Sequence, residues 1–158
     1  MMRGVFTPAV LATCAFSLCA ALPTTGAAQS IAPCDWRASA QAIVEPWDMF
    51  SRTYANGDVR VALLDTIEPG AGALHLLVLS PPRDELGSRQ CNVVSYDGSI
   101  GFAGMLFEDH IADYDPLRGL TLSFDAQIYR DDLADFAPAI LDVTINQSTG
   151  VIEAVVFQ

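Results

Sequence analysis

The stretch that decides the fold is Leu120-Thr121-Leu122-Ser123-Phe124-Asp125-Ala126-Gln127-Ile128, in which apolar and polar side chains alternate at every position. Because successive side chains of a β-strand point to opposite faces, this pattern predicts a strand with one face in the core and the other in water. Similar strands are predicted at 139–146 and 151–157, with a turn at 148–150 between them. We expect these two strands to pack Leu141, Val143 and Ile145 on the same side as Ile152, Ala154 and Val156.

Upstream of this region, Asn56-Gly57 predicts a hairpin. Both residues tolerate positive φ, which suits a two-residue turn between strands at 51–55 and 58–64. The next predicted strand, 73–80, is apolar on both faces and should therefore be central in its sheet. A surface loop is expected at 81–89, because Pro81 and Pro82 cannot donate to a sheet ladder.

A second hairpin is predicted around Asp97-Gly98, between strands at 90–96 and 99–107. The polar residues 108–119 are expected to form a loop, and the Ala-rich residues 35–44 a short helix. The sequence thus predicts a mainly β protein, or α+β, built as an antiparallel meander of about eight short strands with a short N-terminal helix. The pattern leaves open a curled sheet, a small barrel and a sandwich.

The first 28 residues predict a secretory signal peptide. Arg3 precedes an apolar run, and the small residues Gly26-Ala27-Ala28 suit cleavage near Ala28. A membrane anchor or a lipoprotein acylated on Cys14 fits less well, because the flanks are not those of an anchor and the apolar run continues beyond Cys14 to Leu22. We therefore expect a cleaved signal over 1–28 and a single β-rich domain over 29–158.

Two cysteines, Cys34 and Cys91, remain after such cleavage. An even pair in an exported chain is normally bridged, so we predict a Cys34–Cys91 disulfide. All eight cationic residues are Arg, and the absence of Lys beside abundant Ala is typical of GC-rich bacterial genomes. The expected location is therefore the periplasm or the extracellular medium.

The charge of the chain excludes some partners. Eight cationic and 19 acidic residues give a net charge of −11. Loss of Arg3 with the signal leaves seven cations against the same 19 acids, a net charge of −12. A surface this acidic is unsuited to nucleic acid or anionic membranes. The sequence calls for no membrane span in the mature chain and no cofactor.

The weak candidates for a metal site lie around one of the two histidines. Glu108, Asp109, His110, Asp113 and Asp115 carry ligand types that a divalent cation prefers, although their spacing matches no known metal-binding loop. The other histidine, His75, falls on an apolar strand and is expected to be structural. Gly-x-Ser-x-Gly and Ser-x-x-Lys motifs are missing from the sequence, so no catalytic residue is predicted.

A polar sheet face is the remaining candidate surface. The predicted alternation turns the following residues away from the core: Asp58, Arg60, Asp125, Gln127, Asp142, Thr144, Asn146 and Glu153. Trp47 and Phe50 are aromatic residues that could line the rim of such a surface.

These observations favour an exported, non-enzymatic binding module of the cell envelope, with an envelope protein or a small ligand as its partner. Two alternatives stay open. The first is a cation-dependent hydrolase or calcium-stabilised domain that uses the acidic loop around His110, and the second is a carrier that encloses an apolar ligand.

Overall fold

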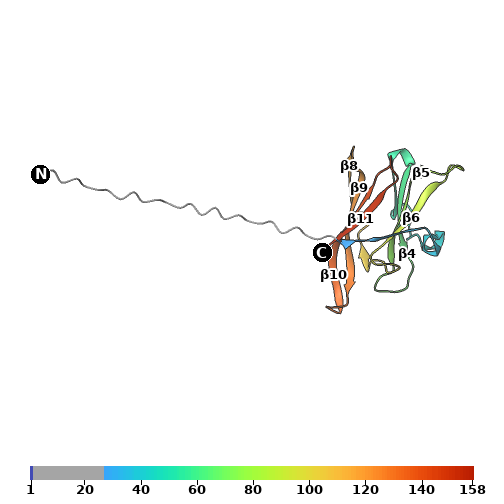
Figure 1. Ribbon diagram of the computed structural model, residues 1–158. Coiled ribbons are helices and arrows are strands. Elements are labelled where there is room, and N and C mark those ends of the chain that lie inside the picture. The colour runs from blue at the N-terminus through green and yellow to red at the C-terminus, as the bar shows by residue number, and fades with distance from the viewer. Residues whose placement is uncertain (2–26) are drawn as a thin grey trace.

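The computed structural model describes Met1 and residues 27–158, and residues 27–158 form two antiparallel β-sheets packed face to face (Figure 1). Sheet A contains β1 (Ala27–Ala28), β11 (Ile152–Phe157), β10 (Asp135–Ile145), β9 (Gly119–Arg130) and β7 (Gly104–Met105) in spatial order, and β8 (Ile111–Asp115) also pairs with β9. Sheet B contains β2 (Ser30–Pro33), β6 (Arg89–Ser95), β5 (Leu74–Arg83), β4 (Val59–Asp65) and β3 (Ser51–Tyr54).

The predicted mainly β, antiparallel fold is confirmed, and of the three arrangements left open the chain adopts the sandwich, because the two sheets do not close into a barrel. The strand over 120–128 lies within β9, which pairs along its length with β10. The expected pairing of the last two strands is also confirmed. Val143 lies opposite Ala154, and Leu141 lies opposite Val156.

The main core fills the space between the sheets. Alternate residues of each strand point inward, as the period of two requires. Sheet B contributes Val59, Val61, Leu63, Leu76, Val78 and Val94, and sheet A contributes Leu120, Leu122, Phe124, Ile128, Leu141, Val143, Ile145 and Val156. The interior that a carrier would need is therefore occupied by side chains.

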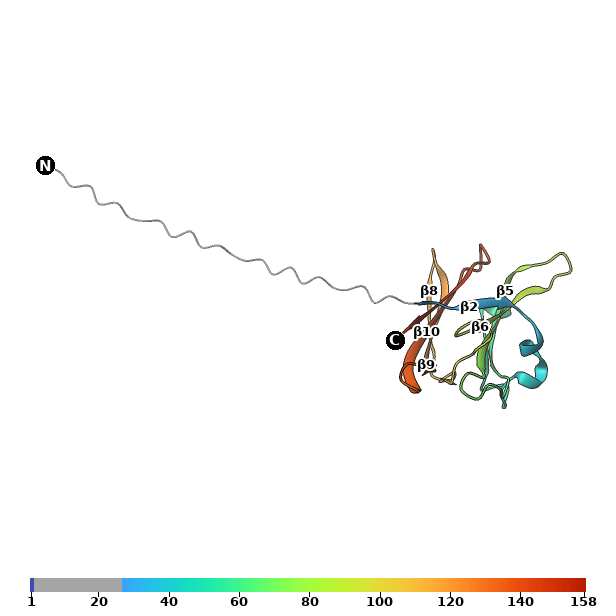
Figure 2. The same ribbon diagram turned by 60° about the horizontal axis from the view of Figure 1, so that its bottom comes forward.

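A second, smaller core lies on the outer face of sheet B, the face turned away from sheet A. Ala62, Leu64, Leu77 and Val93 are buried there against the segment that follows β2. Both views show this blue-to-cyan segment beside the green strands of sheet B, on the face turned away from the orange strands of sheet A (Figures 1 and 2).

The helix predicted at 35–44 is wrong. The segment instead forms two 3-10 turns, η1 (Trp36–Ala38) and η2 (Ala40–Ala42). Ser39 between them is extended, with φ −81° and ψ 153°, and Ile43 forms a β-bridge to Leu64. Packing against the edge of β4 overrides the helical propensity of the alanines.

Four other expectations change. The first hairpin turn spans four residues, because Tyr54 pairs with Val59 and a short 3-10 turn, η3 (Ala55–Gly57), lies between them. Strand β5 continues through Pro81 and Pro82 to Arg83, and the register shifts there to accommodate the prolines.

The predicted hairpin partner at 99–107 does not form. Only β7 is a strand in that region, and it pairs with β9 in the opposite sheet, because the chain crosses between sheets after Phe102. Gly101 passes so close to β5 that a Cβ there would lie 2.2 Å from the carbonyl oxygen of Leu74. The region expected to be a loop, 108–119, contains β8.

The N-terminal strand connects the two sheets. Ala27 and Ala28 pair with Val156 and Val155 of sheet A, and the chain then enters sheet B as β2. Residues 2–26 of the predicted signal peptide lie outside the described residues, whereas its last two residues form β1. Among the described residues, no helix is long and apolar enough to cross a membrane.

Candidate functional site

The outer face of sheet A, turned away from sheet B, carries cross-strand rows of side chains. In one row Asp125 of β9, Ile140 of β10 and Phe157 of β11 lie directly opposite one another. The neighbouring row consists of Ser123, Asp142 and Val155. Side chains opposite one another in such a row have Cβ atoms about 5 Å apart, so each row forms a continuous strip across three strands.

A groove of about 650 Å³ lies on this face where β7, β9, β10 and β11 meet. Its lining includes Leu106, Asp125, Gln127, Pro138, Ile140 and Phe157. A depression of about 330 Å³ shares Asp125, Ile140 and Phe157 with it and adds Asp109, Ile111 and Asp142. Because they share three residues, we treat the two as one feature, the sheet A groove, whose size is in the range of ligand-binding sites.

The floor of the groove is apolar and open to water. Leu106 is 59% exposed and Ile140 is 46% exposed. The outward positions of β10 at this end of the strand are Phe136, Pro138 and Ile140, which places three apolar residues on a face that usually carries polar ones. Scattered exposed apolar side chains need no explanation, but a group of them in a concave surface is a candidate for binding.

Two carboxylates, Asp125 and Asp142, lie among these apolar residues, and a third, Glu153, lies beyond the groove. Asp125, Asp142 and Glu153 lie on successive strands, each displaced by one row from the last, and we call them the acidic diagonal. Diagonal neighbours in a sheet are about 7–8 Å apart, close enough for like charges to repel. In the described part of the chain none of the three forms an ion pair; the acidic partners of the ion pairs found there are Asp35, Asp58 and Asp132.

One oxygen of the diagonal is unusual. Asp142 Oδ1 is buried and has no hydrogen-bond partner among the described residues. A carboxylate held partly out of water without a donor costs free energy, and a cation near its accessible part offsets some of that cost through its charge. Within residues 27–158 no Arg lines the groove, and Arg118 lies beyond it beside Glu153.

Comparison with protein families, curated proteins and solved structures gives no match for this chain.

The metal candidates are not brought together. Both ring nitrogens of His110 are occupied, since Nδ1 donates to the carbonyl oxygen of Phe107 and Nε2 accepts from the hydroxyl of Tyr54. Asp115 Oδ1 accepts from two backbone N–H groups of the following turn. Glu108, Asp109 and Asp113 are exposed, and no group of three potential metal ligands occurs among the described residues.

His110 links the two sheets instead. Its ring stacks on Phe124 of β9 with centroids 4.9 Å apart, while its bond to Tyr54 reaches β3 of sheet B. Burial raises the pKa of Tyr54, which keeps its hydroxyl protonated as the donor of that bond. Asp109 is the one metal candidate that lines the sheet A groove.

His75 belongs to a buried polar network beneath the segment that covers sheet B. Arg37 Nη1 donates to Ser95 Oγ over 2.9 Å, and Ser95 Oγ lies 2.9 Å from His75 Nδ1. An Arg can only donate, so Ser95 Oγ accepts from Arg37, and its own hydroxyl hydrogen is left free to donate to Nδ1 when a neutral imidazole carries its proton on Nε2. Burial, assisted by the Arg37 charge, lowers the pKa of His75 to about 4.

This network pairs a serine with a histidine, but it is a structural arrangement. Ser95 and His75 are each 1% exposed and Arg37 is 4% exposed, so no substrate can reach the hydroxyl. Asp35 holds Arg37 through hydrogen bonds to Nε and Nη2, and these bonds lower the pKa of Asp35.

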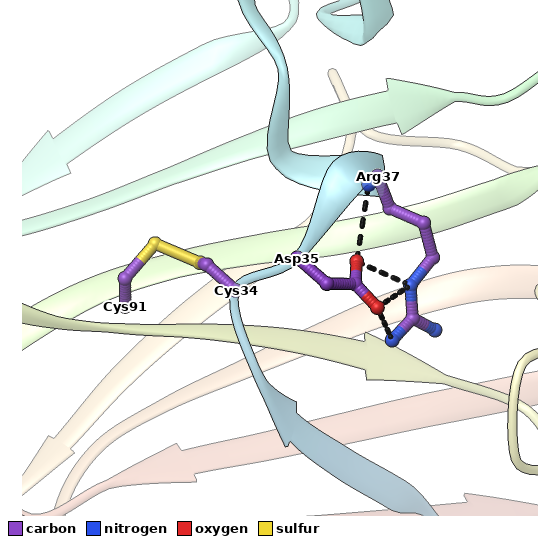
Figure 3. The surroundings of a disulfide bond; sticks show 4 residues. All are labelled: Cys34, Asp35, Arg37 and Cys91. Carbon is purple, nitrogen blue, oxygen red and sulfur yellow. Dashed lines mark hydrogen bonds and ion pairs between the residues drawn. A yellow bond between two sulfur atoms is a disulfide. The ribbon is translucent and has the colours of Figure 1, made fainter.

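The predicted disulfide between Cys34 and Cys91 is confirmed, with Cα atoms 5.3 Å apart. Figure 3 shows that Asp35 and Arg37 directly follow the bridge, which joins the covering segment to β6. A disulfide of this kind indicates a location outside the cytoplasm.

The predicted polar face is partly the candidate site. Asp125, Gln127, Asp142, Thr144 and Glu153 share the outer face of sheet A, whereas Asp58 and Arg60 belong to the β4 region of sheet B. Sequence reasoning missed the apolar members of the groove. Writing out both faces of β10 would have revealed Phe136, Pro138 and Ile140 alternating with its core residues.

Proposed function

We propose that this chain is an exported, non-catalytic binding module of the cell envelope, and that its ligand occupies the sheet A groove. The observation that carries the proposal is a concave, apolar surface of about 650 Å³ on a sheet face that no described segment covers. Fully burying an exposed aliphatic side chain contributes about 1.5–3 kcal/mol, and Ile140, which is still 46% exposed, leaves roughly half of that to an occupant.

The disulfide and the predicted signal peptide together support export. Cleavage near Ala28 would separate the β1 residues from the domain and leave Val155 and Val156 of β11 without their strand partners. N-terminal sequencing of the exported protein tests this part of the proposal. A first residue at or near Gln29 supports processing, and an intact N-terminus contradicts it.

Binding of the uncharged apolar dye Nile red tests the groove itself. We expect the dye to fluoresce with the folded protein, and the response to fall severalfold in Ile140→Ser, because the variant removes an apolar wall of the groove. Leu86→Ser is the matched control. Leu86 is an exposed aliphatic residue in the loop after β5, a strand of sheet B, whereas the groove lies on sheet A. Equal dye binding by all three proteins would contradict the proposal.

A further inference from the structure

We infer that the occupant of the sheet A groove is a cationic, apolar peptide segment of a partner protein, in which Arg or Lys stands among bulky apolar side chains. This inference rests on the proposed function and adds the chemistry of the ligand. It is drawn from the charges that line the groove, from the unpartnered oxygen of Asp142, and from the shape of the surface.

The charges of the groove have one sign. Asp109, Asp125 and Asp142 line it, and no cation does within residues 27–158. Asp125 and Asp142 are diagonal neighbours on adjacent strands, so their mutual repulsion is uncompensated in the unbound protein. A ligand cation placed between them relieves that repulsion and gains attraction from both carboxylates.

Asp142 strengthens the preference for a cation. Its Oδ1 is buried and unpartnered, and because the residue as a whole is only partly buried, a ligand reaches Asp142 through the part of the carboxylate that remains accessible. A guanidinium presents several N–H groups in a plane and matches a carboxylate better than a hydrated point charge does. Arg is therefore the cation we expect most often at this position.

The apolar part of the ligand follows from the residues on either side. Ile140 stands directly between Asp125 and Phe157 in one row, and Leu106 and Pro138 lie beside it in the groove. A segment that places a cation at the diagonal must therefore lay apolar side chains against these residues. Removing that apolar surface from water supplies the main part of the binding free energy.

The shape favours a peptide over an enclosed small molecule. The lining extends from β7 and β8 across β9 and β10 to β11, so it crosses three strand-to-strand steps. At about 4.8 Å per step the surface is roughly 14 Å wide, which equals four or five residues of extended chain. A second copy of this chain is unsuited, because it would present the same acidic face.

The test is a selection of random 12-residue peptides displayed on phage against the exported protein. We expect the selected peptides to be enriched in both Arg or Lys and bulky apolar residues. With Asp125→Asn/Asp142→Asn as bait, the cationic enrichment should disappear while the apolar enrichment remains. Glu85→Gln is the matched control, since it removes one exposed carboxylate from the loop after β5 and should select the same peptides as the unchanged protein.

The best peptide is then measured by fluorescence anisotropy. Replacing its cations by Gln should weaken binding to the unchanged protein about tenfold, as expected for the loss of two surface ion pairs, and should hardly affect binding to the double variant. Ile140→Ser should weaken both peptides.

Each contrary result has its own meaning. Peptides selected without a charge preference, or enriched in acids, overturn the inference while groove binding stands. Nile red binding without any peptide enrichment also overturns it and identifies a small apolar ligand as the occupant. Self-association of the protein that Ile140→Ser abolishes overturns it in favour of a second copy. If the unchanged protein gives no fluorescence with Nile red, the proposed function itself is contradicted.

Discussion

The outer faces of the two sheets differ in what covers them. On sheet B, Leu64, Leu77 and Val93 lie under the segment that carries η1 and η2, which a disulfide joins to β6. On sheet A, Ile140 and Leu106 face water with no described segment above them. A sheet buries one face in its sandwich, and its second face must be polar or be covered by something else.

The comparison separates apolar side chains that stabilise the fold from apolar side chains that remain exposed to solvent. The apolar residues on the outer face of sheet B are supported by a polar network and a covalent bond. Those on sheet A are mixed with unpaired carboxylates, which an internal core would not tolerate. We therefore interpret the first face as structural and the second as a surface for a partner.

The largest expected effect is the loss of the disulfide. Cys34→Ala/Cys91→Ala frees a loop with a sequence separation of 57 residues, and the loop-closure estimate for that length is about 4 kcal/mol of unfolding free energy. Urea denaturation followed by circular dichroism measures it, with the reduced unchanged protein as the control. A loss below about 1 kcal/mol would mean that packing alone holds the covering segment.

A matched pair of truncations compares the two faces directly. Leu64→Ala leaves a cavity in the second core and should cost about 2–5 kcal/mol, because Leu64 is fully buried. Ile140→Ala, on the open face, should cost less than about 1 kcal/mol. Both are measured from denaturation midpoints. Similar losses in the two variants would show that Ile140 is part of a core and would remove the contrast.

The buried network of Arg37, Ser95 and His75 predicts that the stability of the fold depends on pH. The pKa of His75 is about 4 in the folded protein and 6.5 ordinarily, so the unfolded chain takes up a proton first as the pH falls. Stability from the neutral imidazole is complete above about pH 7 and is lost between about pH 6.5 and 4, with about 2 kcal/mol gone at pH 5.

Urea denaturation at pH 7 and pH 5 measures this loss. His75→Gln supplies the control, since an amide does not titrate and its oxygen can still accept from Ser95. The variant should therefore lose less stability than the unchanged protein over this pH range. An equal loss in both proteins would assign the effect to other groups.

The smallest effect is expected on the open face. Asp142→Asn removes a like-charge neighbour of Asp125 and Glu153, so the unfolding free energy should rise by a few tenths of a kcal/mol at low salt. The gain should shrink as salt screens the charges. Glu85→Gln serves again as the control and should change little. A clear decrease in stability would instead give Asp142 a structural role.

Much of the fold could be predicted from local patterns. The alternation in β9, β10 and β11 determined which residues face the core, and the pairing of Cys34 with Cys91 followed from the predicted export. The N-terminal helix was wrong because tertiary packing of Ile43 on Leu64 outweighs alanine propensity. Strand β8 was missed because all five of its residues are exposed, so they carry little hydrophobic pattern.

The candidate site was only half predictable. The alternation identified Asp125, Asp142 and Glu153 as outward residues, but their diagonal depends on the register between three strands, which a single sequence does not reveal. His110 is surrounded by acidic residues in the sequence, which suggested a metal site. In the structure its ring nitrogens instead bond Phe107 and Tyr54, and the bond to Tyr54 links the two sheets. Contacts between distant residues decide both outcomes.

The pairing of β1 with β11, which exists only while residues 27 and 28 remain attached, joins the two ends of the described domain. Ala27 is among the first residues of the fold to be synthesised, and its partner Val156 is among the last. The edge of sheet A therefore cannot be completed while the chain is still emerging, and contacts this far apart in sequence form slowly. In the uncleaved chain, this edge of sheet A is therefore expected to be among the last parts of the fold to form.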